Sequence, residues 1–377
     1  MKGKQGLVCM GLLLVLSSCH TGKQITASGL QRKDFQTEVN GQHTDLFTLS
    51  NKQGMEVCIT NYGARVVSIL VPDRNGKRED VVCGFSTITE YMEQRQNFGS
   101  TVGRYIGRIL NARFTLDGVE YKLVPNNGKS GHISHGGNPG FADRIWKVEQ
   151  ADTHRACLSY LSPDGENGFP GNLKVTLVYS LGEDDNALDL TYEATTDAPT
   201  VLNLSHHSFF NISGNFTKSV EDQQLWVDAD RFTPYDDKKC VTGEYLPVAG
   251  TPLDFRMPHA IGECIDADHP QLKVVNGYDH TWELNTKGDD TRPAAWVYDP
   301  ASGRKMEIFT TEPGMQIYTG NGLKGKMTGK GGIAYPFRSA VCFETMHFQD
   351  SPNQPGFPST VLRPGEVFRS HTVYKFE

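Results

Sequence analysis

The 377-residue sequence predicts an all-β protein, a large antiparallel β-sandwich, and two observations support this fold class. Short alternating or β-branched runs recur along most of the chain, among them "LKVTLVYSL", "ALDLTYEATT", "KMEIFTT" and "AVCFETMHF". Turn sequences rich in Gly, Pro, Asn and Asp, such as "DRNG" and "PDG", separate these runs. Many short strands joined by such turns are typical of sandwiches and barrels. Helical periodicity is weak, and "TITEYMEQRQ" is the best helix candidate.

The chain divides into an N-terminal leader and one domain. Residues 1–18 have a basic start, a short apolar run and small residues before Cys19, as a secretory signal does. The sequence "LSSC" resembles the bacterial lipobox, which implies cleavage before Cys19 and acylation of its thiol; an ordinary signal peptide with an incidental cysteine is the alternative. We expect residues 19–33 to be a polar tether and residues 34–377 to form a single β-sandwich domain.

These features predict an exported lipoprotein whose acyl chains anchor it to a membrane, facing the periplasm or the cell exterior. The sequence does not decide between the inner and the outer membrane, and it leaves the oligomeric state open. A net charge of −7 without any basic run argues against nucleic acid as a partner. The cysteines after Cys19 form no CxxC pair and no Cys/His metal spacing, so we expect no thiolate zinc site.

One predicted strand, "AVCFETMHF", carries a carboxylate among apolar residues. Side chains alternate across a strand, so Glu344 shares a face with Cys342 and Met346, while Phe343 and Thr345 point to the other face. A buried lone carboxylate is unfavourable unless it is paired or tuned. Burial raises a carboxyl pKa and makes the group a stronger base near neutral pH. A structural glutamate paired with an arginine is the alternative.

A second strand-like run, "TVLNLSHHSFF", contains adjacent histidines that must point to opposite faces. Alternation places His207 on the face of Asn203 and Ser205, and His206 among leucines. The polar face therefore makes His207 the candidate functional residue.

Ionisable residues also interrupt three loop-like stretches: "GRYIGRI" with Arg104 and Arg108, "GHISHGGNPGF" with His132 and His135, and "NGYDHTWEL" with Asp279 and His280. Each has a plain structural explanation, such as a solvated arginine or an aspartate that caps a turn. Their histidines and carboxylates could be combined into a metal site. No HExxH pattern is present, and adjacent strand histidines cannot face one ion, so we expect no metal.

With these stretches in view, the sequence resembles the aldose 1-epimerase (galactose mutarotase) family from about residue 40 to the C-terminus. The resemblance rests on an ordered set of motifs: "GRYIGRI", "SHGGNPGF", "SPDGENGFPGNLKVTLVYSL", "LNLSHHSFFNISG", "VNGYDHTW", "TTEPGMQIYTGN", "VCFETMHFQDSPNQPGFPS" and "LRPGEVF". It implies a β-sandwich with a sugar cleft on one face. It also implies acid–base interconversion of the α and β anomers of a free, glucose- or galactose-like aldose, with no cofactor.

The resemblance also assigns roles by position. It implies that Glu344 is the general base and His207 the general acid. The substrate-binding residues it implies are Arg108, His135, Asp279 and Gln316. One position departs from the pattern, because many members have Asn where this chain has Gly107. A hydrogen bond to the sugar is therefore expected to be missing or replaced.

Other functions remain to be weighed. A non-catalytic carbohydrate-binding β-sandwich would keep the cleft, but it would not need both Glu344 and His207. A glycoside hydrolase or lyase usually needs two carboxylates beside the scissile bond, and Asp279 is the obvious partner for Glu344. A sugar-phosphate epimerase would need a cluster of cations, which the sequence does not show.

Overall fold

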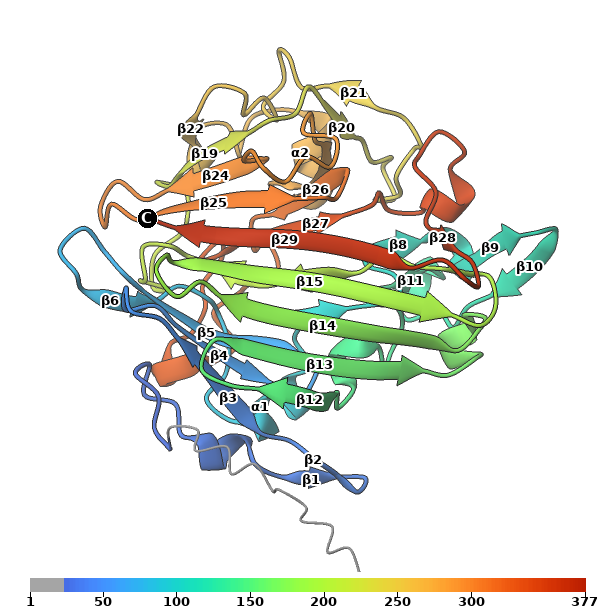
Figure 1. The fold of residues 1–377 in the computed structure, drawn as a ribbon. Helices are drawn as coiled ribbons and strands as arrows, with labels where there is room; N and C mark the ends of the chain where they lie inside the picture. Colours follow the sequence, from blue (N-terminus) through green and yellow to red (C-terminus); the bar gives the residue numbers. More distant parts are fainter. Residues whose placement is uncertain (1–23) are drawn as a thin grey trace, which may run out of the picture.

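A computed structural model describes residues 24–377, which fold into two main layers of antiparallel β-sheet (Figure 1). The larger layer is a nine-stranded sheet; its strands in spatial order are β12 (Lys147–Ala151), β13 (Arg155–Ser162), β14 (Leu173–Leu181), β15 (Ala187–Thr196), β29 (Phe368–Phe376), β25 (Lys305–Thr310), β24 (Ala295–Tyr298), β19 (Gln224–Val227) and β22 (His259–Ala260). The second layer is a six-stranded sheet of β18 (Phe209–Phe210), β27 (Val341–Met346), β26 (Gly314–Tyr318), β23 (Asp279–Glu283), β20 (Arg231–Thr233) and β21 (Leu246–Pro247). The predicted all-β antiparallel sandwich is confirmed.

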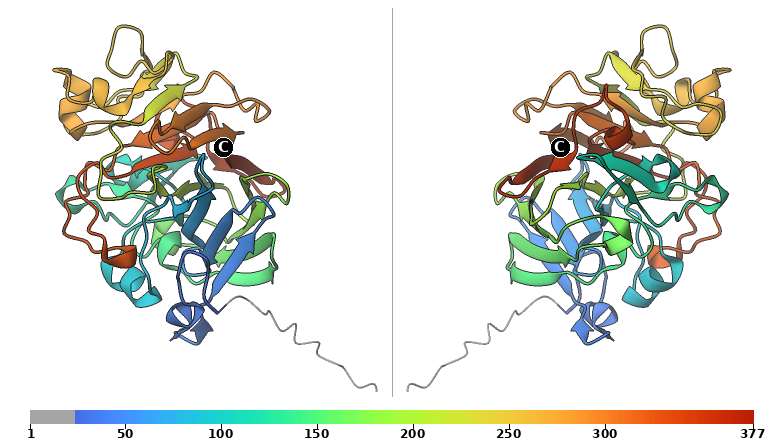
Figure 2. Two further views of the ribbon diagram at one scale, coloured as in Figure 1. Left: turned by 90° about the vertical axis from the view of Figure 1, so that its left-hand side faces the viewer. Right: turned by 90° about the vertical axis from the view of Figure 1, so that its right-hand side faces the viewer.

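A four-stranded sheet extends the sandwich at one end, beside β12 and β13, as Figure 2 shows from both sides. Its strands are β3 (Leu46–Ser50), β4 (Glu56–Thr60), β5 (Arg65–Pro72) and β6 (Arg78–Asp80). The remaining strands form two-stranded ladders: β7 (Ser100–Val102) with β17 (Ser205–His207), β8 (Arg108–Ile109) with β11 (Ile133–Ser134), β1 (Glu38–Val39) with β2 (Gln42–His43), β9 (Arg113–Leu116) with β10 (Val119–Lys122), and β16 (Thr200–Val201) with β28 (Val361–Leu362).

The nine-stranded sheet has one buried face and one outer face. Along β14, every second side chain is buried, and the intervening ones are exposed or half-buried. This alternation is the pattern expected of a strand that covers a core on one side only. The buried side chains of this sheet, among them Leu173, Val175, Leu177, Tyr179 and Leu190, belong to one apolar core that also contains residues of the six-stranded and four-stranded sheets.

Strand β27 in the six-stranded sheet is buried on both faces. Its Thr345 side chain faces the nine-stranded sheet, where its hydroxyl lies 2.7 Å from that of Thr372 in β29. The backbone carbonyl of Phe343, two residues before Thr345, accepts a hydrogen bond from the hydroxyl of Tyr374, which also lies in β29. Residues 342, 344 and 346 must therefore point to the opposite side, away from the nine-stranded sheet.

Two helices lie within the described residues. The predicted helix is confirmed as α1 (Ile88–Gln94), which begins with a capping box between Thr87 and Glu90. The second helix, α2 (Pro270–Val275), was not expected, because six residues are too few to show a helical period in the sequence. It begins at a proline in the first turn, after a histidine whose side chain accepts a backbone hydrogen bond.

The N-terminal segment differs from the expected tether. Residues 1–18 and Cys19 lie outside the described residues, but residues 24–33 pack onto the sandwich. Leu30 is buried in an apolar cluster, and the amide of Ala27 donates to the Glu56 carboxylate at 2.6 Å. Arg32 pairs with Asp45 at 2.8 Å. The tether prediction is therefore wrong for residues 24–33: its polar composition concealed one apolar anchor and specific partners on the domain.

Within residues 24–377, no helix combines the length and apolar character needed to cross a membrane.

Candidate active site

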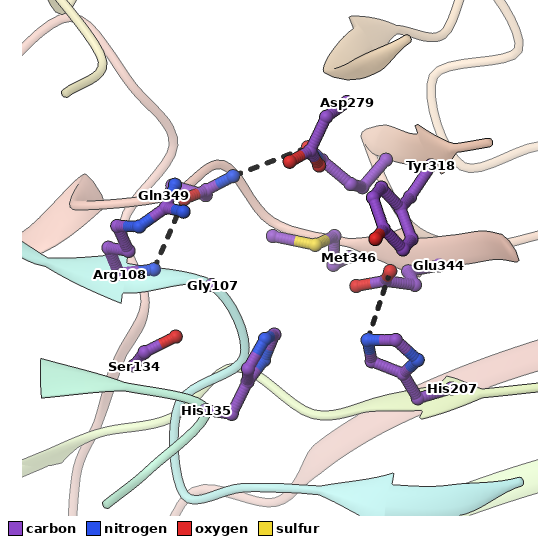
Figure 3. Close-up of a pocket in the computed structure, with 11 residues that line it drawn as sticks. Gly107, Arg108, Ser134, His135, His207, Asp279, Tyr318, Glu344, Met346 and Gln349 are labelled. Carbon is purple, nitrogen blue, oxygen red and sulfur yellow. Dashed lines mark hydrogen bonds and ion pairs between the residues drawn. The ribbon is translucent and has the colours of Figure 1, made fainter. Parts of the chain in front are cut away.

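A pocket of about 230 Å³ opens on the face of the six-stranded sheet that points away from the nine-stranded sheet (Figure 3). Its walls consist of Gly107, Arg108, Ser134, His135, His207, Asp279, Gln316, Tyr318, Glu344, Met346 and Gln349. All six residues to which the sequence assigned catalytic or binding roles thus line one pocket. They come from six separate segments of the chain, which the fold brings together.

Strand register builds the pocket floor. Gln316 of β26 pairs with Glu344 of β27 on one side and with Thr281 of β23 on the other. Two residues along the strands, Tyr318 pairs with both Asp279 and Cys342. Directly opposed residues in an antiparallel sheet point to the same face. The sheet therefore presents two neighbouring rows of side chains to the pocket.

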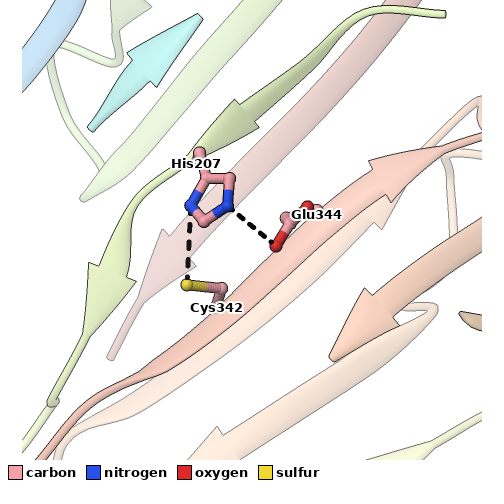
Figure 4. Close-up of side chains that lie close together, drawn as sticks. All are labelled: His207, Cys342 and Glu344. Carbon is pink, nitrogen blue, oxygen red and sulfur yellow. Dashed lines mark hydrogen bonds and ion pairs between the residues drawn. The ribbon is translucent and has the colours of Figure 1, made fainter. Parts of the chain in front are cut away.

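The pocket holds one buried acid–base pair. His207 projects from β17, and its Nε2 lies 3.3 Å from Oε1 of Glu344 (Figure 4). Its Nδ1 lies 3.8 Å from the Cys342 sulfur on the other side of the ring. Only 8% of the His207 side chain and 5% of the Glu344 side chain are exposed to solvent.

Burial shifts both members of this pair toward their uncharged forms. The pKa of the Glu344 carboxyl is raised well above its usual range, first by burial and then by the nearby charge of Asp279. The pKa of His207 is lowered to about 4, mainly by burial, against a backbone hydrogen bond that favours the charged ring. Both shifts therefore disfavour the charged carboxylate–imidazolium form of the pair and favour a protonated carboxyl beside a neutral imidazole.

Arg108 lies across the pocket from this pair, and the His135 ring lies between them, 5.3 Å from the His207 ring (Figure 3). Arg108 starts β8, and the backbone N–H of His135, just after β11, donates to the carbonyl of Gly107 at 2.9 Å. Burial lowers the pKa of His135 to about 3, so its ring is neutral near pH 7. Its buried Nδ1 has no hydrogen-bond partner among the residues that the structure describes.

A network of amides joins the floor to the wall that contains Arg108. The Gln316 Nε2 donates to the Asp279 carboxylate at 2.6 Å, and its Oε1 accepts from the Thr281 hydroxyl. Gln349 donates from Nε2 to the Tyr235 hydroxyl at 2.6 Å and to Gln316 Oε1 at 3.3 Å. Burial raises the pKa of Asp279, an effect that Arg108 and the Gln316 hydrogen bond oppose. The network holds Asp279 and Gln316 in fixed orientations.

Gln349 also fills the space beside Gly107. A Cβ atom added to Gly107 would lie 2.5 Å from the Gln349 Cγ, and the glycine has a φ of +76°. The Oε1 of Gln349 accepts the backbone N–H of Arg108 at 3.2 Å. An amide side chain therefore lines the pocket at this point, but it comes from the segment after β27 rather than from position 107.

The other ionisable residues of the same motifs have structural roles. Arg104 is buried and donates to the carbonyls of Ser162, Pro163 and Pro170. His132 accepts from the Asn111 amide, and His280 is buried beside Gln271. His206 bonds to Ser208 at 2.6 Å and lies against Tyr179 and Tyr374 in the core. His206 therefore faces the core and His207 faces the pocket, as strand alternation predicted.

Sequence analysis assigned no role to Ser134, Tyr318, Met346 and Gln349. Two of these carried a usable signal, because Tyr318 lies two residues after Gln316 and Met346 two after Glu344 on the same strands. Period-two alternation would have placed both on the pocket face. Gln349 and Ser134 lie at or beyond strand ends, where no period applies.

Among residues 24–377, one group of potential metal ligands includes the acid–base pair: His207, Cys342 and Glu344. Burial raises the pKa of the Cys342 thiol far above its usual value, whereas metal binding needs a thiolate. The two His207 nitrogens also face different partners, one Cys342 and the other Glu344. The donor set therefore fits proton transfer better than it fits an ion.

Together, the antiparallel sandwich and its polar pocket with one buried acid–base pair define an enzyme whose chemistry is proton transfer. The profile of the family described as aldose 1-epimerase matches residues 45–375. The galactose mutarotase of Sus scrofa is 39% identical over 330 residues, which cover 88% of this chain and 93% of that protein. The aldose 1-epimerase of Escherichia coli K12 is 36% identical over 339 residues, covering 89% and 96%.

Solved structures agree with these sequence relatives. An aldose epimerase homologue from C. elegans superposes with a TM-score of 0.81 at 30% identity and covers 89% of this chain and 99% of its own. A galactose 1-epimerase from Lactobacillus acidophilus superposes with a TM-score of 0.79 at 28% identity, covering 90% and 96%. The chain belongs to the aldose 1-epimerase family, and it is an isomerase of the mutarotase type.

Replacing Gln349 tests whether its amide positions the pocket. Gln349→Ala removes bonds to Arg108, Gln316 and Tyr235, and each neutral hydrogen bond typically contributes about 1 kcal/mol. We expect KM for the aldose to rise about tenfold while kcat changes much less, because the acid–base pair is untouched. Initial rates by polarimetry measure both constants. The exposed Gln150→Ala is the control, and an unchanged KM in Gln349→Ala would refute the positioning role.

Proposed function

We propose that the protein interconverts the α and β anomers of a free aldopyranose such as glucose or galactose, with Glu344 as general base and His207 as general acid. The observation that supports this most is the buried pair of Nε2 and Oε1, 3.3 Å apart, at one end of a sugar-sized polar pocket. Both groups are close enough to reach two neighbouring oxygens of one pyranose ring.

Ring opening moves two protons and breaks one bond. The Glu344 carboxylate takes the proton from the C1 hydroxyl, the bond between C1 and the ring oxygen breaks, and the His207 imidazolium protonates that oxygen. The product is the open-chain aldehyde, which rotates about its C1–C2 bond. Closure on the other face returns a proton from Glu344 to O1 and takes the ring-oxygen proton back to His207. No electron or group leaves the sugar, so the chemistry requires no cofactor.

The pair needs no proton from solvent to complete this cycle. Moving its shared proton from Glu344 to His207 yields the carboxylate and imidazolium from which opening starts. After opening, the pair is again a protonated carboxyl beside a neutral imidazole, which is the form that burial favours. The desolvated site thus lowers the energy of the enzyme in its complex with the open-chain sugar.

Four further residues would bind the sugar. Arg108 and His135, which both line the pocket, are suited to binding sugar hydroxyls. The Asp279 carboxylate and the Gln316 amide are suited to hydroxyls above the floor, where the amide network fixes them. Fixed hydrogen-bond partners hold the ring in a reactive orientation, which lowers the entropic part of the barrier. A binding module without catalysis would gain nothing from the buried acid–base pair, which makes this alternative less favourable.

Glu344→Gln tests the base directly. The amide cannot accept the C1 proton, so kcat for α-D-galactose should fall by about 10²–10⁴-fold, the usual contribution of a general base. Polarimetry of freshly dissolved sugar measures the rate over buffer. Glu312→Gln is a matched control, because Glu312 is also buried and pairs with a histidine, His347, at 2.7 Å outside the pocket. Full activity of Glu344→Gln would refute the mechanism; no acceleration by the wild type with any common aldose would refute the function.

The pH dependence follows from the shared proton. Below the lowered pKa of His207, about 4, the pair binds a second proton, and no base remains for the C1 hydroxyl. Above the raised pKa of Glu344, the pair loses its only proton, and no acid remains. We expect a bell-shaped profile of kcat/KM whose acid limb lies near pH 4, measured with rates extrapolated to zero buffer. An acid limb near the usual histidine pKa of 6.5 would contradict this assignment.

We further propose that the full chain is an exported lipoprotein, acylated at Cys19 and anchored to a membrane. The supporting pattern is the basic start, the apolar run and the "LSSC" sequence, all outside the described residues. In a bacterial host the wild type should incorporate labelled palmitate and fractionate with membranes, and Cys19→Ala should do neither. Cys9→Ala is the matched control, since Cys9 would be removed with the signal. An unlabelled, cytoplasmic wild type would overturn this placement.

A further inference from the structure

The proposed reaction assigns no role to Tyr318 of β26, although its side chain lines the pocket. Strand pairing places Tyr318 directly opposite Cys342, whose sulfur contacts the His207 ring. The tyrosine ring packs edge-on against Phe209, and Phe209 in turn stacks on the His207 ring. Figure 3 shows Tyr318 beside Glu344. Tyr318 therefore lies at the end of the pocket that holds the acid–base pair.

The hydroxyl of Tyr318 accepts a hydrogen bond but donates none to another residue within the described part of the chain. The backbone N–H of Gly322 donates to its oxygen at 2.6 Å. Tyr105 and Tyr335 also accept a backbone N–H, and each donates its own proton to a backbone carbonyl, at 3.0 and 2.8 Å. Of these three hydroxyls, that of Tyr318 thus keeps its donor capacity, and it does so in the sugar pocket.

The turn after β26 fixes the position of this hydroxyl. The side-chain amide of Asn321 donates to the backbone carbonyls of Val275 and Tyr278, at 3.2 and 3.0 Å, and so anchors the turn to the end of α2. A Cβ atom added to Gly322 would lie 2.8 Å from the Tyr318 oxygen, so this position has room for glycine alone. The result is a hydrogen-bond donor that is held in place before a sugar binds.

The surroundings of Tyr318 keep its proton on the oxygen. Burial raises the pKa of the phenol, and the negative charge of Asp279, directly opposite on β23, raises it further. The charge of Glu344 acts in the same direction, against the hydrogen bond from Gly322. Tyr318 is therefore a neutral donor of a hydrogen bond, and it does not give up its proton.

Ring opening needs such a donor at O1. When Glu344 removes the O1 proton, O1 carries negative charge until the bond between C1 and the ring oxygen breaks and O1 becomes the aldehyde oxygen. A fixed donor at O1 stabilises this charge. In the closing direction, the same hydrogen bond polarises the aldehyde for attack by the ring oxygen. Neither member of the acid–base pair has this task, because Glu344 acts as a base at O1 and His207 acts at the ring oxygen.

We propose that Tyr318 is a third catalytic residue, whose hydroxyl donates a hydrogen bond to O1 of the sugar during opening and closure. Its proton stays on Tyr318 throughout, so the proton balance between Glu344, His207 and the sugar is unchanged. This inference rests on the proposed function, because the roles of Glu344 and His207 place O1 at the end of the pocket where Tyr318 lies.

Tyr318→Phe tests this role, because it removes the hydroxyl and keeps the ring. We expect kcat for galactose to fall about 10²-fold with little change in KM, since the hydrogen bond acts mainly on the charge that develops at O1. The inhibition constant of 1,5-anhydro-D-galactitol, which lacks O1, should stay the same. Gly322→Ala, which displaces the hydroxyl without removing it, should also lower kcat. Polarimetry measures all of these constants.

Tyr335→Phe is the matched control. It also loses hydrogen bonds to a glycine backbone, that of Gly84, but Tyr335 does not line the pocket, so kcat should stay at the wild-type value. Circular dichroism establishes that each variant is folded, and Gly322→Ala decides the matter if Tyr318→Phe does not fold.

The outcomes separate this inference from the proposed function. If the wild type accelerates no sugar, the proposed function fails, and the role of Tyr318 fails with it. If the wild type is active and folded Tyr318→Phe keeps its full kcat, the proposed function stands and the role of Tyr318 is wrong. A higher KM together with weaker inhibition by the anhydro sugar, at unchanged kcat, would also overturn the role, because the hydroxyl would then bind a different oxygen of the sugar. Full kcat in Gly322→Ala would contradict the need for a fixed donor.

Discussion

The double burial of β27 is the constraint on which the site depends. One face of this strand must pack in the core, where the Thr345 hydroxyl is hydrogen-bonded to that of Thr372 in the nine-stranded sheet. The other face must then carry Glu344 into the pocket, because successive side chains of a strand cannot share a face. A slip of one residue would exchange the two faces and place a carboxylate in the core. Packing of the sandwich and placement of Glu344 in the pocket are therefore one requirement.

Electrostatics explains why such a pair is kept. Replacing a buried ion pair by well-packed apolar residues is often neutral or stabilising, so stability alone does not account for His207 beside Glu344. What burial supplies is a raised pKa on the carboxyl and a lowered pKa on the imidazole. These shifts favour the form in which the proton lies on Glu344 and both groups are uncharged. A proton that can reside on either group is what a reversible exchange of anomers uses in its two directions.

The sequence carried the fold and half of the site in its periodicity. Alternation alone separated His207 from His206 and Glu344 from Thr345, because both pairs lie on strands packed between layers. It could not rank Arg108 above Arg104, since both lie in the irregular stretch around β8, where burial depends on distant segments. Only the family resemblance selected Arg108 as a pocket residue. Gln349 was missed for the same physical reason. The N-terminal segment was misjudged because one leucine and a few polar contacts with distant residues hold it, and none of these shows as a period in the sequence.

Gln349 supplies an amide side chain beside Gly107, and this shows how the two ends of the pocket differ. A mutarotase must bind both anomers, so the C1 end has to tolerate either configuration and allow rotation about C1–C2. That end contains the acid–base pair and the flexible side chain of Met346, which adapts to shape. The remote end contains amides locked to one another. An amide lost at position 107 can be supplied from position 349 because only its location relative to the remote hydroxyls matters, and the fold brings both segments to the same wall. Under the proposed roles, the remote end supplies the contacts that would select among sugars, while the strands supply the chemistry.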